Sequence, residues 1–287
     1  MNGIIVKGIG GFYYVKASGK IYECKARGIL RKQRITPMIG DKVKIELCGE
    51  KGSITEILPR SSFLVRPPVA NVDTMMLVIA AASPAPNLLL IDKMLVNAEI
   101  NNIKPVICIN KTDIASSGDI VNIYSAAGYS VLTVSAEKRE GIDSLYQYII
   151  DKTTAFAGLS GVGKSSILSI IMDNTLETGS VSEKIQRGRH TTRHVELFEL
   201  PEGGFVLDTP GFSSLEVEGI KAGDLQLYFP EMSDCADECR FRGCSHVNEP
   251  DCAVKEKLRE GKMAPSRYDS YIQLYNQLKS VKEWENK

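Results

Sequence analysis

The stretch that decides the fold is Gly158-Leu159-Ser160-Gly161-Val162-Gly163-Lys164-Ser165. It matches G-x-x-x-x-G-K-S, a loop whose backbone N–H groups wrap nucleotide phosphates and whose glycines allow close approach of the main chain. Residues 153–157 predict a buried strand before the loop, and residues 164–172 predict a helix whose N-terminus faces the phosphates. In such a loop Lys164 reaches the β- and γ-phosphates, and the Ser165 hydroxyl holds Mg²⁺. The stretch therefore predicts a P-loop in an α/β sheet.

Three further motifs complete a guanine-nucleotide site, but their order along the chain is unusual. Asn110-Lys111-Thr112-Asp113 and Ser135-Ala136 precede the P-loop, and Asp208-Thr209-Pro210-Gly211 follows it. An ordinary small GTPase has its phosphate loop first and its guanine-reading motif near the end. All the parts are present here and only the entry point of the chain differs. The order therefore predicts a circularly permuted GTPase domain.

The residues before the P-loop are suited to reading the base. A carboxylate at Asp113 accepts from both N1–H and the exocyclic amine of guanine, and adenine lacks that pair of donors. Lys111 would lie along the base plane, and Asn110 would tie its loop to the P-loop. Ser135-Ala136 ends a predicted strand and would place a backbone N–H near guanine O6.

The motif after the P-loop is suited to the metal and the γ-phosphate. Asp208 ends an apolar run and would reach Mg²⁺ directly or through water, and Gly211 would offer its N–H to the γ-phosphate. Many GTPases carry a glutamine after that glycine to orient the attacking water, whereas this chain has Phe212. Either hydrolysis is slow or another group substitutes.

Residues 187–194 stand where the first switch segment is expected. One threonine should complete the Mg²⁺ shell, and we favour Thr192 over Thr191. His190 is the nearest candidate for orienting water, with His194 behind it. The predicted catalytic residues are thus His190, Lys164 and Thr192, and the predicted nucleotide-binding residues are Asn110, Lys111, Asp113, Ser135, Ala136, Gly158, Leu159, Ser160, Gly161, Val162, Gly163, Lys164, Ser165, Ser166, Asp208 and Gly211.

The net charge of zero over 287 residues hides an asymmetry. Residues 1–66 hold thirteen Lys/Arg and five Asp/Glu, a charge of +8, which suggests a nucleic-acid partner. Short apolar runs split by glycines predict a small five-stranded barrel of the OB type in this region, with an SH3-like barrel as the alternative. One loop carries four of the cations: Arg27, Arg31, Lys32 and Arg34.

A cysteine-rich segment near the C-terminus predicts a metal site. Cys239, Cys244, His246 and Cys252 are three thiolates and an imidazole within fourteen residues, which suits a closed tetrahedral zinc site. Cys235 is a rival ligand on spacing alone. Residues 253–260 and 266–284 predict helices after this cysteine-rich segment.

The chain has no apolar run long enough for a membrane helix and no secretory pattern at its start, so we expect a cytoplasmic protein with reduced thiols.

Alternating elements fill the middle of the chain, with strands expected at 74–80 and 106–109 and helices at 88–100 and 119–127. This alternation is typical of a mostly parallel sheet covered on both faces. We therefore expect an α/β P-loop GTPase domain, circularly permuted, at 67–220, an N-terminal OB-fold β-barrel that binds RNA at 1–66, and a C-terminal α-helical zinc-binding module at 221–287.

This layout resembles the ribosome small subunit-dependent GTPase A family of bacterial ribosome-assembly GTPases. The motifs that carry the resemblance are 110–113 before 158–165, Gly188 to Thr192, 208–212, and Cys239, Cys244, His246 and Cys252, a ligand set that leaves out Cys235. The resemblance implies GTP/GDP, Mg²⁺ and one Zn²⁺ per chain as cofactors. It also implies late maturation of the small ribosomal subunit, a GTPase activity stimulated by that subunit, and contact with its rRNA. We expect no membrane partner and a monomer away from the ribosome.

Two alternatives stay open. One is an RNA-binding GTP switch in which hydrolysis is incidental, and the other is a permuted GTPase that acts on another ribosomal particle.

Overall fold

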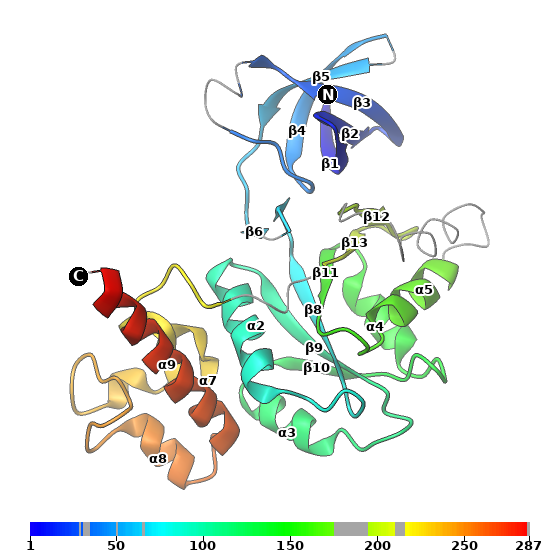
Figure 1. Ribbon diagram of the computed structural model, residues 1–287. Helices are drawn as coiled ribbons and strands as arrows, with labels where there is room; N and C mark the ends of the chain where they lie inside the picture. The colour runs from blue at the N-terminus through cyan, green and yellow to red at the C-terminus, as the bar shows by residue number, and fades with distance from the viewer. Residues whose placement is uncertain are drawn as a thin grey trace.

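The computed structural model describes residues 1–28, 30, 35–49, 51–64, 67–174, 195–209 and 216–285. Figure 1 shows an N-terminal barrel standing above a central sheet, with a helical C-terminal module against one side of that sheet. No helix within the described ranges is long and apolar enough to cross a membrane.

The barrel closes through five strands: β1 (Asn2–Ile9), β2 (Phe12–Ala17), β3 (Lys20–Ala26), β4 (Lys42–Cys48) and β5 (Lys51–Ile57). The spatial order is β1-β2-β3-β5-β4, with β4 returning to pair with β1. The strands β3 and β5 run parallel, and the other pairs are antiparallel. Alternate side chains such as Ile5, Val15 and Ile54 fill the interior. This Greek-key order is that of the OB-type barrel expected from the sequence.

A six-stranded sheet forms the second part, in the order β10-β9-β8-β11-β13-β12. Its strands are β8 (Thr74–Ala80), β9 (Lys104–Asn110), β10 (Ser130–Thr133), β11 (Thr153–Ala157), β12 (Phe198–Glu199) and β13 (Phe205–Asp208). All neighbours are parallel except β12 and β13. The chain runs outward from β8 to β10 and then returns to β11 beside β8. The strand order therefore reverses between β8 and β11, where α/β sheets bind ligands at their carboxyl ends.

Helices cover both faces of this sheet (Figure 1). The helices α2 (Leu88–Ile100) and α3 (Gly118–Ala126) pack on one face, and α4 (Ile142–Ile149) and α5 (Lys164–Asn174) pack on the other. The strand β8 is buried along its whole length, with Met75, Leu77 and Ile79 facing α2 and the alternate residues facing α5. A strand covered on both faces has no polar side, which is why this segment reads as a continuous apolar run.

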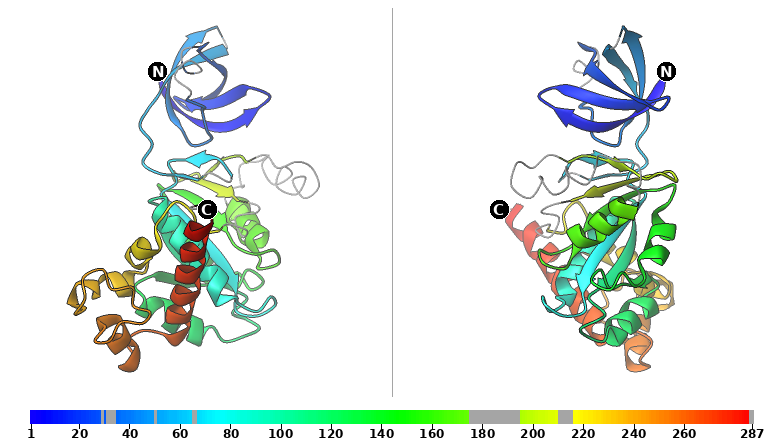
Figure 2. Two further views of the ribbon diagram at one scale, coloured as in Figure 1. Left: turned by 60° about the vertical axis from the view of Figure 1, so that its left-hand side comes forward. Right: turned by 90° about the vertical axis from the view of Figure 1, so that its right-hand side faces the viewer.

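The C-terminal module contains the short helices η2 (Ala222–Tyr228), α7 (Pro230–Ser233) and η3 (Ala236–Glu238), followed by α8 (Ala253–Arg259) and α9 (Pro265–Glu285). The long helix α9 lies against α2, as Figure 2 shows. Leu274, Leu278 and Tyr271 of α9 share an apolar core with Val96 of α2. These apolar side chains of α9 therefore belong to the core.

A two-stranded hairpin, β6 (Phe63–Leu64) and β7 (Val69–Ala70), joins barrel and sheet. The amide of Ala70 donates to the carbonyl of Ile39 at 2.8 Å, and Asn71 Nδ2 donates to the carbonyl of Gly40 at 2.9 Å. A Cβ on Gly40 would lie 2.0 Å from the carbonyl oxygen of Ala70, so this contact requires glycine. The predicted architecture, with a β-barrel, an α/β sheet and a helical module that holds the Cys₃His group, is confirmed.

Candidate functional site

The P-loop leaves β11 and enters α5 at the point where the strand order reverses. Gly158 has φ +141°, and a Cβ there would lie 2.1 Å from the carbonyl oxygen of Val78. Gly163 has φ +96°, and a Cβ there would lie 2.2 Å from Nδ2 of Asn110. Both glycines are therefore required by contacts with β8 and with the residue that ends β9, as well as by the curvature of the loop.

Asn110 lies between the two halves of the site. Its Nδ2 donates to the carbonyl of Val162 in the P-loop at 2.9 Å, and its Oδ1 accepts the amide of Ala136 at 3.0 Å. The side chain is 2% exposed. This one amide group brings the phosphate loop together with the two loops expected to read the base.

Asp113 is held by its neighbour on the next loop. Ser135 Oγ donates to Asp113 Oδ1 at 2.7 Å and accepts the amide of Lys138 at 3.1 Å. The hydrogen bond from Ser135 lowers the pKa of Asp113, which keeps the carboxyl ionised. An ionised carboxylate only accepts, as a guanine edge with two donors requires. Lys111, at φ +65°, sends its ammonium back to the carbonyl of Ser83.

Lys164 and Asp208 are close enough to influence each other electrostatically beside the P-loop. The ammonium of Lys164 donates to the carbonyls of Gly158 and Leu159, each at 2.8 Å. Burial lowers the pKa of Lys164, and the nearby Asp208 raises it. Burial raises the pKa of Asp208, and Lys164 opposes that shift.

One oxygen of Asp208 marks a candidate metal position. Asp208 Oδ1 is buried and has no hydrogen-bond partner among the described residues. The following residue is anchored, because Thr209 donates its hydroxyl and its amide to the carbonyl of Phe156 at 2.8 and 3.0 Å. A hard divalent cation takes carboxylate oxygens as ligands, so an unpaired buried carboxylate oxygen beside the phosphate loop fits Mg²⁺.

Several predicted residues lie outside the described ranges: His190, Thr191, Thr192, His194, Gly211 and Phe212. The same holds for Arg31, Lys32 and Arg34 of the basic loop. Arg27 is described, and its guanidinium pairs with Glu46. The roles assigned to all of these residues stay predictions.

The four predicted metal ligands of the C-terminal module come together. Their ligand atoms all lie within 4.8 Å of one another. Nδ1 of His246 is 3.6 Å from Cys239 Sγ and 3.3 Å from Cys252 Sγ, and those two sulfurs are 3.9 Å apart. A tetrahedral zinc with Zn–S bonds of about 2.3 Å separates its sulfurs by roughly 3.8 Å. The geometry of this Cys₃His cluster therefore suits zinc.

Residues outside the motif orient this cluster. Nε2 of the imidazole is 2.5 Å from Gln226 Oε1, which fixes the tautomer that leaves Nδ1 free to face the thiols. From α9, Tyr268 donates its hydroxyl to the carbonyl of His246 at 2.7 Å, and Tyr271 donates to the carbonyl of Ser245 at 2.9 Å. The sequence reasoning missed Gln226, since nothing in the ligand spacing points to a residue twenty positions upstream. Cys235 is buried, and its thiol faces the carbonyl of Met232 instead of the cluster.

Comparisons with known proteins show which family this chain is similar to. A family model described as RsgA GTPase matches residues 57–218, and one described as RsgA N-terminal domain matches residues 2–54. The chain belongs to the RsgA family. Two similar relatives are named "Small ribosomal subunit biogenesis GTPase RsgA". The one from Ruminiclostridium cellulolyticum is 50% identical, covering 99% of this chain and 96% of that protein. The one from Caldanaerobacter subterraneus subsp. tengcongensis is 50% identical and covers 100% and 98%.

Solved structures of RsgA-like proteins agree with the fold. YjeQ from Thermotoga maritima superposes with a TM-score of 0.84 at 36% identity, covering 96% of this chain and 98% of that one. YloQ, described as a circularly permuted GTPase, gives a TM-score of 0.83 at 37% identity and covers 98% and 95%. The family resemblance, the GTPase activity and the permuted motif order predicted from the sequence are thereby confirmed.

Proposed function

We propose that this RsgA-family GTPase hydrolyses GTP as a factor in late maturation of the small ribosomal subunit, and that the subunit stimulates its activity. The observation that carries the proposal is the bridge made by Asn110, which joins the phosphate loop to the base-reading loops in one site. The relatives named as small ribosomal subunit biogenesis GTPases support the choice of particle. The surplus of thirteen Lys/Arg over five Asp/Glu in residues 1–66 supports an RNA partner.

In this function the phosphates of GTP or GDP lie on the P-loop, where Lys164 and the amides of 158–166 meet their charge. The ammonium of Lys164 leaves its two carbonyl partners for the phosphates, which are the stronger acceptors. Asp113 accepts from the guanine edge. Mg²⁺, held through Ser165 and Asp208, supplies charge neutralisation of the phosphates. Thr192 and His190 are assigned to the metal shell and to the attacking water on the sequence alone.

The roles of the zinc ion and of the three domains, and the location of the protein, complete the proposal. One Zn²⁺ per chain, bound by Cys239, Cys244, His246 and Cys252, has a structural role, because all four ligand positions are taken by the protein. We assign RNA binding to a basic OB-fold at 1–66, catalysis to the permuted GTPase domain at 67–220 and zinc binding to the helical module at 221–287. We place the protein in the cytoplasm, bound to the small subunit and its rRNA, and monomeric away from it.

A pull-down tests the choice of particle. The tagged full chain, loaded with a non-hydrolysable GTP analogue, is incubated with purified small and large subunits in separate reactions. The proposal expects retention of the small subunit only, and more weakly with GDP. Retention of the large subunit instead would favour a permuted GTPase of another ribosomal particle. Matched single-turnover hydrolysis with and without small subunits tests the other alternative, in which hydrolysis is incidental.

A further inference from the structure

The barrel contacts the GTPase sheet at the edge strand β12, which pairs with the strand β13 that ends at Asp208. The strand β12 is the last strand of the six-stranded sheet and pairs only with β13 within that sheet. Its outer side faces the barrel, and Figure 1 shows β12 directly below it. An isolated antiparallel bridge pairs Lys7 of β1 with Glu196, one residue before the Leu197 that leads into β12. The barrel thus covers the open edge of the GTPase sheet.

An irregularity in β1 makes this contact possible. The register of β1 with β2 shifts between Ile5 and Lys7, so Val6 has no partner on β2. A bulge of this kind frees one residue from its ladder and turns it outward. The carbonyl of Val6 accepts the amide of Leu197 at 2.9 Å. Val6 and Leu197 are 6% and 5% exposed and belong to the apolar core of the GTPase sheet, although Val6 is a barrel residue.

Two lysines reinforce the same junction. Lys7 Nζ lies 2.6 Å from Glu196 Oε2, with side chains 28% and 30% exposed. Lys16 of β2 pairs with Glu199 at the other end of β12. These ammonium groups are neutralised by carboxylates of the GTPase domain. By contrast, Lys20, Lys25 and Lys42 of the barrel have no ion pair with any described residue.

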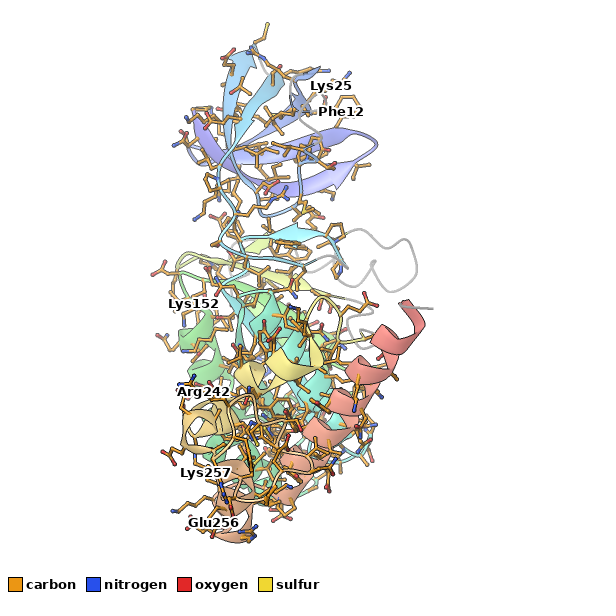
Figure 3. All side chains as sticks on the ribbon, turned by 90° about the vertical axis from the view of Figure 1, so that its left-hand side faces the viewer. Phe12, Lys25, Lys152, Arg242, Glu256 and Lys257 are labelled. Carbon is orange, nitrogen blue, oxygen red and sulfur yellow. The ribbon has the colours of Figure 1, made fainter. Side chains whose placement is uncertain are left out.

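Figure 3 shows one of these unpaired barrel lysines, Lys25, beside Phe12, with its ammonium 4.7 Å from the ring centroid. A cation next to an aromatic face suits nucleic acid, which offers phosphates and stacking bases together. The barrel cations therefore differ in their partners. The unpaired lysines are free for RNA, cations such as Arg27 and Lys44 pair with carboxylates of the barrel itself, and Lys7 and Lys16 pair with carboxylates of the neighbouring domain.

The strand held by these lysines leads along the described chain toward the GTP site. Downstream, β12 turns into β13, with Phe198 paired to Val206, and β13 ends at Asp208. The contacts at Val6, Lys7 and Lys16 thus hold the strand that pairs with β13, the strand that ends at Asp208.

We propose that Lys7 and Lys16 are positioning residues for subunit-stimulated hydrolysis: they hold β12 against the barrel, so that docking of the barrel on RNA is transmitted through β13 to Asp208. This inference rests on the proposed function. It assigns these two lysines to the coupling between docking and catalysis and excludes them from the phosphate contacts. A charge-reversal cycle tests this coupling.

The experiment measures four quantities in the full-length protein: the basal hydrolysis rate, the rate at saturating small subunits, the Kd for GTP and the Kd for subunits. The variants are Lys7→Glu, Glu196→Lys and the double reversal, with Lys16→Glu and Glu199→Lys as a second cycle. Lys7→Glu should lower the stimulated rate about 2- to 30-fold, the range for disrupted coupling. Basal rate and both Kd values should change less than about twofold, and the double reversal should restore stimulation. Lys7→Gln removes the charge without repulsion and gives the same direction of change if Lys7→Glu does not fold.

A matched control exists inside the barrel. Lys44 and Glu56 form an ion pair at 2.7 Å, with side chains about half exposed, and both belong to barrel strands. Reversing this pair should leave stimulation unchanged. An unchanged stimulated rate in Lys7→Glu overturns the inference. A double reversal whose stimulated rate is as low as that of the single change also overturns it. The same holds if Lys7→Glu binds subunits more weakly and with a flatter dependence of log K on log salt, because Lys7 would then be a phosphate contact. A wild-type protein that subunits do not stimulate overturns the proposed function and this inference together, whereas a stimulated wild type with unaffected variants overturns the inference only.

Discussion

Arg267 is a buried cation that joins the C-terminal module to the GTPase domain. Its side chain is 1% exposed, and its Nη1 lies 2.6 Å from Asp92 Oδ1 of α2. Its Nε lies 2.7 Å from Glu231 Oε1 of α7, and its guanidinium carbon is 4.4 Å from the ring centroid of Phe229. We predict that Arg267→Met lowers the free energy of unfolding by about 3–5 kcal/mol, because the change leaves two buried carboxylates without their cation.

The cost of this substitution should depend on pH. Burial raises the pKa of Asp92, and Arg267 opposes that shift. Without the guanidinium the folded-state pKa rises further, so the folded variant holds a proton that an unfolded aspartate, with a pKa of about 3.9, releases. The contribution of Asp92 to the variant's stability is then fully present below about pH 4 and is lost as the pH rises through the folded pKa. Arg267→Met should therefore cost more at pH 8 than at pH 5.

Urea unfolding of the full chain, followed by circular dichroism of the helices, measures this effect. The control is Arg259→Met, since Arg259 forms an exposed pair with Glu256, and exposed pairs contribute about 0–1 kcal/mol. Removing the charges of Asp92, Glu231 and Arg267 together should recover part of the lost free energy of unfolding. A midpoint for Arg267→Met equal to that of the control, at both pH values, would refute the reasoning.

Four further predictions follow from the site. Asp113→Asn should weaken the affinity or selectivity for GTP roughly 10⁴-fold and shift the preference toward xanthine nucleotides, as measured by nucleotide titration. Equal affinity of the wild type for ATP and GTP would show that Asp113 does not read the base. Cys244→Ala should abolish zinc content and unfold the module, since structural zinc contributes about 10–16 kcal/mol, whereas Cys235→Ala should retain zinc by metal analysis; the reverse result would reassign the ligands. His190→Ala should lower stimulated hydrolysis far more than GTP affinity, and an unchanged stimulated rate would exclude it. Deleting residues 1–66 should weaken subunit binding and flatten its salt dependence, at about 0.7 per lost single-strand phosphate contact; an identical slope would exclude the barrel as anchor.

The elements with strong local patterns could be predicted from the sequence. Thr74–Ala80, Leu88–Ile100 and Thr153–Ala157 have the predicted bounds because a fully buried strand, or a helix capped by Asn87, shows its pattern within a few residues. The helix α4 was not predicted, although Ile142, Leu145 and Ile149 at helical spacing form its buried face and could have indicated it.

The parts that depend on distant contacts could not be predicted. The strand β12 has two residues, too few for a periodic pattern, and it exists because β13 and the barrel lie beside it. The pair of Lys7 and Glu196 joins positions 189 residues apart, and that of Arg267 and Asp92 joins positions 175 apart. A single sequence carries no local signal for such partners. The metal site itself could be predicted because its ligands lie close together in the sequence, although this spacing alone left Cys235 as a rival ligand, whereas the supporting Gln226 could not be predicted.

Single-turnover GTP hydrolysis, with and without small ribosomal subunits, tests the central claim most directly. Without a glutamine after Gly211, the intrinsic rate should be slow, and completing a GTPase site in trans raises rates by about 10³–10⁵-fold. The account predicts a large acceleration by saturating small subunits, none by large subunits, and no acceleration in Lys164→Ala. A rate that small subunits leave unchanged, in protein that binds GTP and holds zinc, would contradict it.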